Sequence, residues 1–288
     1  MEYLMTYGWA ILIIAVVLGA LFQLGIFNAN NFAVKAPPGS CQAYRPNGPG
    51  TPVQGLEGEC TNALPQYVAQ FGGTGYIQIT SLIGAPVGNS QRTMTAWVYV
   101  PITNAYNGIV GYGEGVASLA FTAFADNAYG GTICIDAWGS SGQCGGGYNF
   151  PAGTWTFLAA TYNGVTLEGY TAYGGQVSSF NAGSGPLNTI SVSASTPFFI
   201  AFRTGTPSLV GSVSGVQLYN SSLSPAEVNA LYSEGIGGAP VKPQNLVGWW
   251  PLNGNANDYS GNNNNGAPNT PGAVIYTSAW ASQYTGPV

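Results

Sequence analysis

An unbroken apolar run near the start of the chain limits its possible folds more than any other feature. From Tyr3 to Phe27 there is no charged residue, and most side chains are large and apolar. As a helix this run would be roughly 37 Å long at about 1.5 Å per residue, more than the roughly 30 Å hydrocarbon core of a bilayer. Because exposing so many apolar side chains to water is strongly unfavourable, we expect residues 1–30 to form a helix buried in lipid or protein.

Three interpretations of this run compete. A cleaved secretory signal is disfavoured, because neither a basic start nor a small-residue cleavage site is present. A membrane anchor fits the length, although the first basic residue is Lys35, after the run. A helix bundle fits the small residues, because Ala15 and Gly19 are spaced for close helix packing.

The segment "MEYLMTYGWAILIIAVVL" resembles the N-terminal helix of archaeal type IV pilin-like proteins, and Glu2 matches a glutamate near the mature N-terminus of that family. The resemblance implies a helix that first inserts into the membrane and then bundles with other copies in a filament. The family's basic leader does not precede it, which implies that the leader was removed or that the start lies upstream. The residues expected in the filament core are Glu2, Tyr3, Leu4, Trp9, Ile13, Ala15, Gly19, Phe22 and Phe27.

Charge is scarce throughout the chain. Only 5% of residues are charged, against roughly 25% in an average globular protein, and histidine is absent. With so few titrating groups, we expect stability to change little between neutral and acidic pH. The contents of 45% hydrophobic and 13% aromatic residues exclude a disordered chain, and the net charge of −5 argues against nucleic acid as a partner.

The chain has four cysteines, Cys41, Cys60, Cys134 and Cys144. An even number in a chain rich in glycine and asparagine predicts disulfides and an extracellular, oxidising setting, with free buried thiols or a metal site as alternatives. The cysteines form two local pairs in sequence, Cys41 with Cys60 and Cys134 with Cys144, although four cysteines allow three connectivities. The turn-like segment "CIDAWGSSGQC" favours pairing Cys134 with Cys144.

The polar part of the chain has the pattern of an all-β sandwich. From about Leu64, short runs such as "GYIQIT", "TAWVYV" and "TWTFLAATY" are separated by Gly, Asn and Pro turns. One helix is marked by "SPAEVNALYSEG", where Ser224 and Glu227 predict a capping box and Pro225 the first turn. Gly235 is expected to end it. Its buried face is expected to be Val228, Leu231 and Tyr232.

Four segments in order, "FGGTGYIQI", "MTAWVYV", "GTWTFLAATYNG" and "LSPAEVNALYSEG", resemble laminin G-like jelly rolls of the concanavalin type. The fold class that this implies is mainly β: a jelly-roll β-sandwich preceded by a long hydrophobic N-terminal helix. The expected divisions are a pilin-like helix at 1–30, a Pro/Gly/Asn-rich, disulfide-tied connector at 31–63, the jelly roll at 64–236, and a linker with a C-terminal strand segment at 237–288.

The segment "LVGWWPLNGNANDYSGNNNNG", residues 246–266, resembles the stretch that precedes the first of these motifs in that family. Here it follows the last one. We expect it to supply the strand that would otherwise leave an unpaired edge, with Trp249 and Trp250 as anchors. It could fold back into its own domain, as in a circular permutation, or enter the next subunit. Self-closure is favoured because the linker "GIGGAPVKPQN" could span roughly 30 Å.

Catalytic chemistry finds little support. Without histidine, Ser–His and Cys–His nucleophilic systems and histidine metal sites are excluded. A glycosidase needs only two carboxylates, but those of the polar part are scattered in sequence. They are Glu57, Glu59, Glu114, Asp126, Asp136, Glu168, Glu227, Glu234 and Asp258. We therefore predict no enzyme and no required cofactor.

Binding remains the alternative chemistry. Exposed aromatic faces could stack on surface glycans, although Trp97, Trp155, Trp249 and Trp250 lie in strand-like runs and are expected in the core. Asp258 is a weak candidate calcium ligand, with a turn-forming role favoured. Asn220 in "NSS" is a candidate glycan acceptor.

These observations predict a structural subunit of an archaeal extracellular pilus or thread, a homopolymer whose helices bundle in the filament core while the jelly rolls are displayed outside. The alternative is a monomeric, membrane-anchored, carbohydrate-binding surface protein of the lectin or adhesin type.

Overall fold

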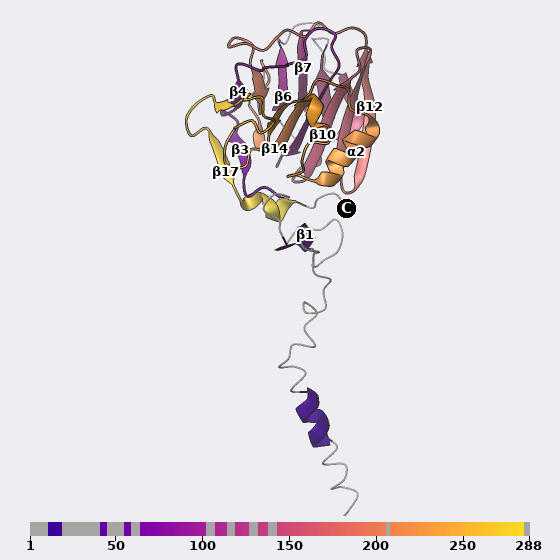
Figure 1. Ribbon diagram of the computed structural model, residues 1–288, viewed down its shortest axis with the longest axis vertical. Coiled ribbons are helices and arrows are strands. Elements are labelled where there is room, and N and C mark those ends of the chain that lie inside the picture. Colours follow the sequence, from indigo (N-terminus) through magenta and orange to yellow (C-terminus); the bar gives the residue numbers. More distant parts are fainter. Residues whose placement is uncertain are drawn as a thin grey trace, which may run out of the picture.

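The computed structural model describes residues 11–18, 41–44, 55–58, 64–101, 107–113, 119–126, 132–137, 143–205 and 208–284. Within these ranges the chain folds into two packed antiparallel sheets, a β-sandwich that confirms the predicted mainly β class (Figure 1). A separate two-stranded ribbon joins β1 (Cys41–Tyr44) to β2 (Gly55–Gly58).

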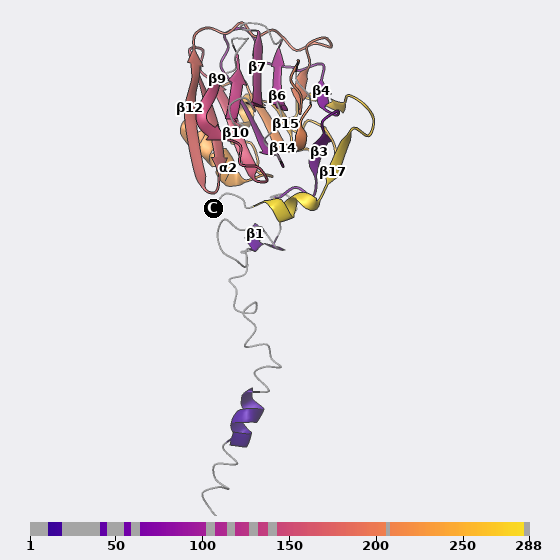
Figure 2. The same ribbon diagram turned by 180° about the vertical axis from the view of Figure 1, so that it is seen from behind.

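The larger sheet has the order β12 (Gln176–Ser184), β11 (Thr166–Tyr173), β10 (Trp155–Tyr162), β5 (Arg92–Tyr99), β14 (Val210–Tyr219), β3 (Val68–Gly72) and β17 (Val274–Thr277), with β15 (Leu246–Trp250) also paired to β14. The smaller sheet has the order β16 (Ala267–Pro268), β4 (Ile77–Ile79), β13 (Phe198–Ile200), β6 (Asn107–Gly113), β7 (Ala120–Asp126), β8 (Thr132–Asp136) and β9 (Gln143–Asn149). Figure 2 shows the sandwich from the opposite side.

The middle of the larger sheet is buried on both faces, and β5 shows why. Alternate residues of a strand point to opposite faces, so Met94, Ala96 and Val98 of β5 enter the core between the sheets. Trp97 of the same strand belongs to a second core on the outer face. A strand with a core on each side can be apolar almost throughout, and only Tyr99 at its end is partly exposed.

Helix α2 (Pro225–Glu234) covers this outer face. The predicted capping box is confirmed: the Ser224 hydroxyl accepts from the Glu227 N–H, and the Glu227 carboxylate accepts from the Ser224 N–H. The predicted buried face is also confirmed, because Val228, Leu231 and Tyr232 are buried. The outer core is completed by the 3-10 helix η5 (Ala279–Gln283), whose Trp280 packs beside them.

The C-terminal segment contributes strands to both sheets of the same chain. β5 occupies one edge of β14, and the other edge is shared by β3 along Val210–Val213 and by β15 along Val216–Tyr219. β17 then pairs with β3, and β16 pairs with β4 of the smaller sheet. A 3-10 helix, η4 (Pro243–Asn245), leads into β15. The segment that resembles a domain opening therefore lies in the sandwich of its own chain.

Only part of the expected N-terminal helix lies within the described residues. A helix was expected over residues 1–30, whereas the described helix covers residues 11–18 and the rest of that range lies outside the described residues. Its apolar side chains are exposed, Ile13 by 58%. These side chains are not covered by the described part of their own chain, whereas helices in proteins gain most of their stability from packing. Among the described residues, no helix combines the length and apolarity needed to cross a membrane.

Candidate functional site

The two tryptophans of β15 face opposite sides of the larger sheet. Trp250 is fully buried and stacks on Phe198 at a centroid distance of 5.0 Å, so it belongs to the core between the sheets. Trp249 points the other way and is only half-buried. The expectation that Trp249 is a core residue is therefore wrong, because the period of two in a strand gives consecutive residues opposite faces.

A single carboxylate organises the loop that follows β15. Asp258 Oδ1 accepts hydrogen bonds from the N–H groups of Trp249 (2.9 Å) and Ser260 (2.8 Å). Its Oδ2 accepts from the Ser260 hydroxyl (2.8 Å) and the Asn264 N–H (2.9 Å). With four donors on its two oxygens, Asp258 has the turn-forming role and is not arranged as a calcium ligand. No metal-binding group of three or more acidic, Cys or His residues occurs in the described part of the chain.

A surface pocket of about 180 Å³ lies where this loop meets the sandwich. It is lined by Leu64, Pro65, Gly215, Ile236, Gly237, Trp249, Pro251, Asn253 and Tyr259. None of these residues carries a charge. The pocket is therefore mainly apolar and aromatic, with a few polar groups, which is the usual character of a small-molecule site.

Two aromatic rings form a corner of this pocket. The Trp249 and Tyr259 centroids are 6.3 Å apart, with an interplanar angle of 68°. Tyr259 is held there because its N–H donates to the Trp249 carbonyl (2.8 Å), while its side chain remains 55% exposed. Asn255 Nδ2 donates to the Tyr259 hydroxyl at 3.2 Å and fixes the outer end of the ring. The loop thus presents a positioned and accessible aromatic corner.

The polar edge of the pocket is provided by Asn253. Its Oδ1 accepts from the Tyr67 N–H at 2.8 Å. This bond fixes the orientation of the amide, and the Nδ2 group has no partner among the described residues. It can therefore donate to a bound hydroxyl or carbonyl.

The pocket floor lies at an irregularity in β14. The pairing of β14 with β5 shifts register between Ser214 and Gln217, and Gly215 adopts a φ of 58°, in the left-handed region. A Cβ at Gly215 would lie 3.1 Å from the Ile236 carbonyl oxygen. The Gly215 N–H and Ser214 hydroxyl both bond the Pro251 carbonyl, at 3.2 and 2.9 Å. The bulge therefore joins the strand to the loop beneath the two rings.

The predicted disulfide residues lie in two places. Cys134 is disulfide-bonded, and Cys144 stands directly opposite it in the register of β8 and β9. Cys41 begins β1, but Cys60 lies outside the described residues. The pairing of Cys41 with Cys60 therefore stays a prediction.

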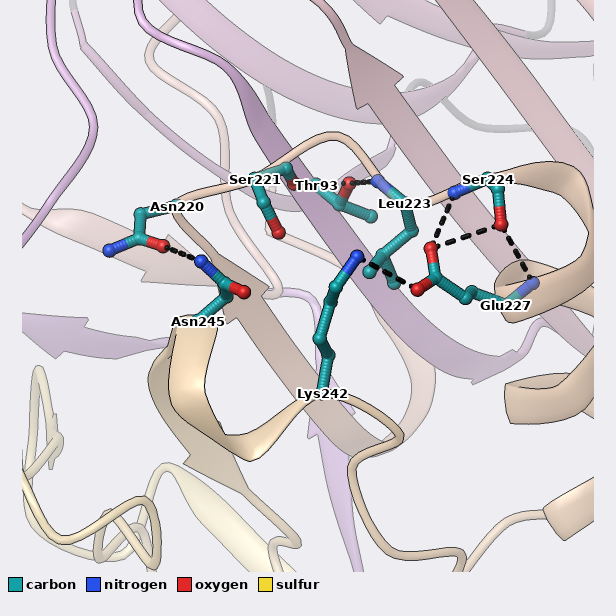
Figure 3. A network of polar contacts seen from close by, with 8 residues as sticks. All are labelled: Thr93, Asn220, Ser221, Leu223, Ser224, Glu227, Lys242 and Asn245. Atoms are coloured by element: carbon teal, nitrogen blue, oxygen red, sulfur yellow. Dashed lines mark hydrogen bonds and ion pairs between the residues drawn. The ribbon is translucent and has the colours of Figure 1, made fainter.

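The remaining predicted residues do not gather at the pocket. Asn220 is exposed at the end of β14, and its Oδ1 accepts from Asn245 Nδ2 at 3.0 Å (Figure 3). Its glycosylation stays a prediction. Ile13 and Ala15 lie in the exposed N-terminal helix, and the other residues assigned to a filament core lie outside the described residues. Trp97 and Trp155 are buried as expected.

Two of the described carboxylates form separate ion pairs. Asp136 forms an ion pair with Arg203 at 2.5 Å, and Glu227 forms one with Lys242 at 2.8 Å. Hydrogen bonding from Lys242, and then from Ser224, lowers the pKa of Glu227. Neither pair lies among the residues lining the aromatic pocket.

Sequence reasoning did not single out Tyr259 or Asn253. Both belong to the quoted segment 246–266, and an aromatic residue inside a turn rich in asparagine and glycine is a usable signal, because such turns lie on the surface. Ile236 and Pro65 could not have been found, because they reach the pocket only through the packing of distant segments.

This chain is similar in structure to several solved proteins. A candidate carbohydrate-binding protein from Bacteroides ovatus has a TM-score of 0.53 at 18% identity, and the match covers 74% of this chain and 60% of that protein. The match to domain 4 of an extracellular arabinanase from Geobacillus stearothermophilus has a TM-score of 0.43 at 17% identity, covering 66% and 86% of the two chains. A Limulus polyphemus pentraxin gives 0.41 at 14%, covering 61% and 85%. No curated protein matches.

The two packed antiparallel sheets define a lectin-type jelly roll. Residues 71–229, more than half of the chain, match a laminin G family of the concanavalin A-like lectin/glucanase superfamily. The chain belongs to this superfamily, and the predicted resemblance to laminin G-like domains is confirmed. The matched range does not include the N-terminal segment, so the resemblance to archaeal pilins gains no support from it.

Proposed function

We propose that this protein binds saccharides at its surface, through the pocket formed by Trp249, Tyr259 and Asn253. The observation that carries the proposal is the aromatic corner: a half-buried tryptophan and a 55% exposed tyrosine at 68° to each other, in a pocket without charged lining.

A saccharide fits this pocket for a chemical reason. One face of a pyranose ring is a surface of C–H groups, which packs on an aromatic ring, whereas its rim carries hydroxyls that need hydrogen-bond partners. Trp249 and Tyr259 supply rings, and the Asn253 amide supplies a donor at the edge. The fold shared with a candidate carbohydrate-binding protein supports the same conclusion. Because no carboxylate lines the pocket, the proposal is binding without hydrolysis.

We propose that this binding function operates at a cell surface, and the apolar N-terminal segment supports this proposal. The described helix exposes its side chains by 47% to 65%, which requires lipid or other protein around it. We propose that it anchors the sandwich to the membrane, with the pocket facing the extracellular medium. The alternative is that this helix packs against the same helix of other copies in a homopolymer. Electron microscopy of material sheared from cells distinguishes the anchor from the homopolymer. Filaments built of this chain would contradict the anchor proposal.

The binding proposal is tested on a glycan array with the full-length chain. The protein is kept in a polyoxyethylene detergent, because a sugar-headed detergent would compete for the site. We expect binding to a restricted set of neutral glycans, and we expect Tyr259→Ala to weaken it by roughly tenfold, which corresponds to about 1.4 kcal/mol.

The matched control is Tyr173→Ala, which removes another exposed tyrosine, 42% accessible, that does not line the pocket. It should bind like the wild type. An array without any bound glycan, or equal losses in both variants, would contradict the proposal.

A further inference from the structure

A second concavity lies on the same outer face of the larger sheet, between β11 and the start of α2. It has a volume of about 510 Å³ and is lined mostly by polar side chains, including Asn163, Thr166 and Ser222. We call it the Glu168 groove. None of its lining residues lines the aromatic pocket.

One of the two carboxylates in the groove is already satisfied. Glu227 Oε1 is 2.8 Å from Lys242 Nζ, and its Oε2 accepts from the Ser224 N–H (2.8 Å) and hydroxyl (3.0 Å) (Figure 3). Lys242 and Glu227 therefore neutralise each other while the carboxylate caps α2.

The other carboxylate has no cationic partner. Glu168 Oε2 accepts a hydrogen bond from the Tyr170 hydroxyl at 2.8 Å. Burial, and then this bond, raise the pKa of Tyr170 to about 12, so the phenol stays a donor at neutral pH. Glu168 Oε1 has no hydrogen-bond or ion-pair partner among the described residues. With Glu227 and Lys242 cancelling, the lining of the groove carries one net negative charge.

We propose that the Glu168 groove binds a saccharide that carries a free ammonium group, with the ammonium held at Glu168. The charge of the groove favours a cation. Its volume is far larger than an ammonium group needs, and its hydroxyl and amide lining suits the hydroxyls of a sugar. Asn163 adds an oriented amide, because its Oδ1 accepts from the N–H groups of Val165 (2.9 Å) and Thr166 (2.8 Å).

The test compares two disaccharides that differ only in the amine: the glucosamine dimer and its N,N′-diacetylated form. Isothermal titration of the full-length chain at roughly pH 6, where the amino sugar is protonated, should show at least about tenfold tighter binding of the amine form. Glu168→Gln should remove this preference, because the amide keeps the shape and loses the charge. Equal affinities for the two sugars, no binding of either, or a preference that survives Glu168→Gln would overturn the proposal.

Two controls separate this site from the rest of the molecule. Glu234→Gln makes the same exchange at an exposed residue outside the groove and should keep the preference. Trp249→Ala should also keep it, so that failure of the aromatic pocket and failure of the groove give different results.

Hydrogen exchange of the wild-type chain tests the location without any variant. The amine-bearing dimer should protect the backbone around Asn163 and Thr166. Protection confined to the loop around Tyr259 would overturn the assignment to this groove.

Discussion

Arg92 is the residue whose surroundings are least expected. It is fully buried in the sandwich, yet neither described ion pair includes it. Its guanidinium donates to the carbonyls of Gly88 (2.6 Å) and Ser90 (2.8 and 2.9 Å) and to the Tyr112 hydroxyl (3.1 Å). It also lies 5.4 Å from the centroid of the Phe121 ring. Carbonyl oxygens and a ring face thus solvate the charge and fasten the turn before β5.

We predict that Arg92→Met lowers the free energy of unfolding by about 3 kcal/mol, because the buried Tyr112 hydroxyl and the part-buried carbonyls of Gly88 and Ser90 lose their donor. Arg92→Lys should cost less, since an ammonium can serve one of them. Urea denaturation measures both, with Lys242→Met, which removes an exposed ion pair worth less than about 1 kcal/mol, as the control. A stable Arg92→Met variant would show that the guanidinium does not hold this turn.

At the scale of elements, the strands and α2 follow from local patterns, because capping residues and alternation act over a few residues. The face of the sheet on which each tryptophan of β15 lies does not follow from a local pattern. In "LVGWW" the two tryptophans are adjacent and both apolar, so the pattern does not say which of them faces the core. The register of β15 on β14, in which Gln217 pairs with Trp249 and Val216 with Trp250, decides it. The candidate sites could not be predicted from the sequence for the same reason. Tyr259 meets Ile236, and Glu168 shares a groove with Glu227, only after distant segments pack.

The opposite orientations of Trp249 and Trp250 predict opposite phenotypes. Trp250→Ala should cost about 3–5 kcal/mol of unfolding free energy, because it empties a core position and removes the Nε1 hydrogen bond to the Asn264 carbonyl (2.8 Å). Trp249→Ala should cost about 1 kcal/mol or less, as expected for a partly exposed residue. Chemical denaturation checks both, and equal costs would mean that β15 is not paired in this register.

For the whole molecule, acid and alkali should act differently. Burial is the main cause that raises the pKa of Tyr112, Tyr170 and Tyr276 from 10.0 to about 12, and that of Tyr219 further. A folded pKa above the unfolded value gives stability that is complete below pH 10 and is lost as the pH rises towards 12. Glu227 affects stability in the opposite direction. Because its pKa is lowered, it contributes stability above about pH 4.5, and this stability is lost as the pH falls through the lowered pKa.

We therefore predict a small decrease in Tm between pH 7 and pH 3, and a larger decrease between pH 10 and pH 12. Over this interval Tyr112 alone corresponds to about 2 kcal/mol, or roughly 4–8 °C for a domain of this size. Calorimetry over the full range measures both limbs, and Tyr112→Phe should reduce the alkaline loss. A larger decrease in Tm in acid than in alkali would contradict the assignment of the pH dependence to the buried tyrosines.

The saccharide site at the aromatic corner of Trp249 and Tyr259 is tested by titrating Trp249→Ala with the strongest ligand from the glycan array. Because central tryptophans in binding sites are commonly worth about 2 kcal/mol or more, we predict at least roughly 30-fold weaker binding, with the Tm of the variant close to that of the wild type. Binding by Trp249→Ala that equals the wild type would show that the saccharide is bound elsewhere, and the proposed site would be wrong.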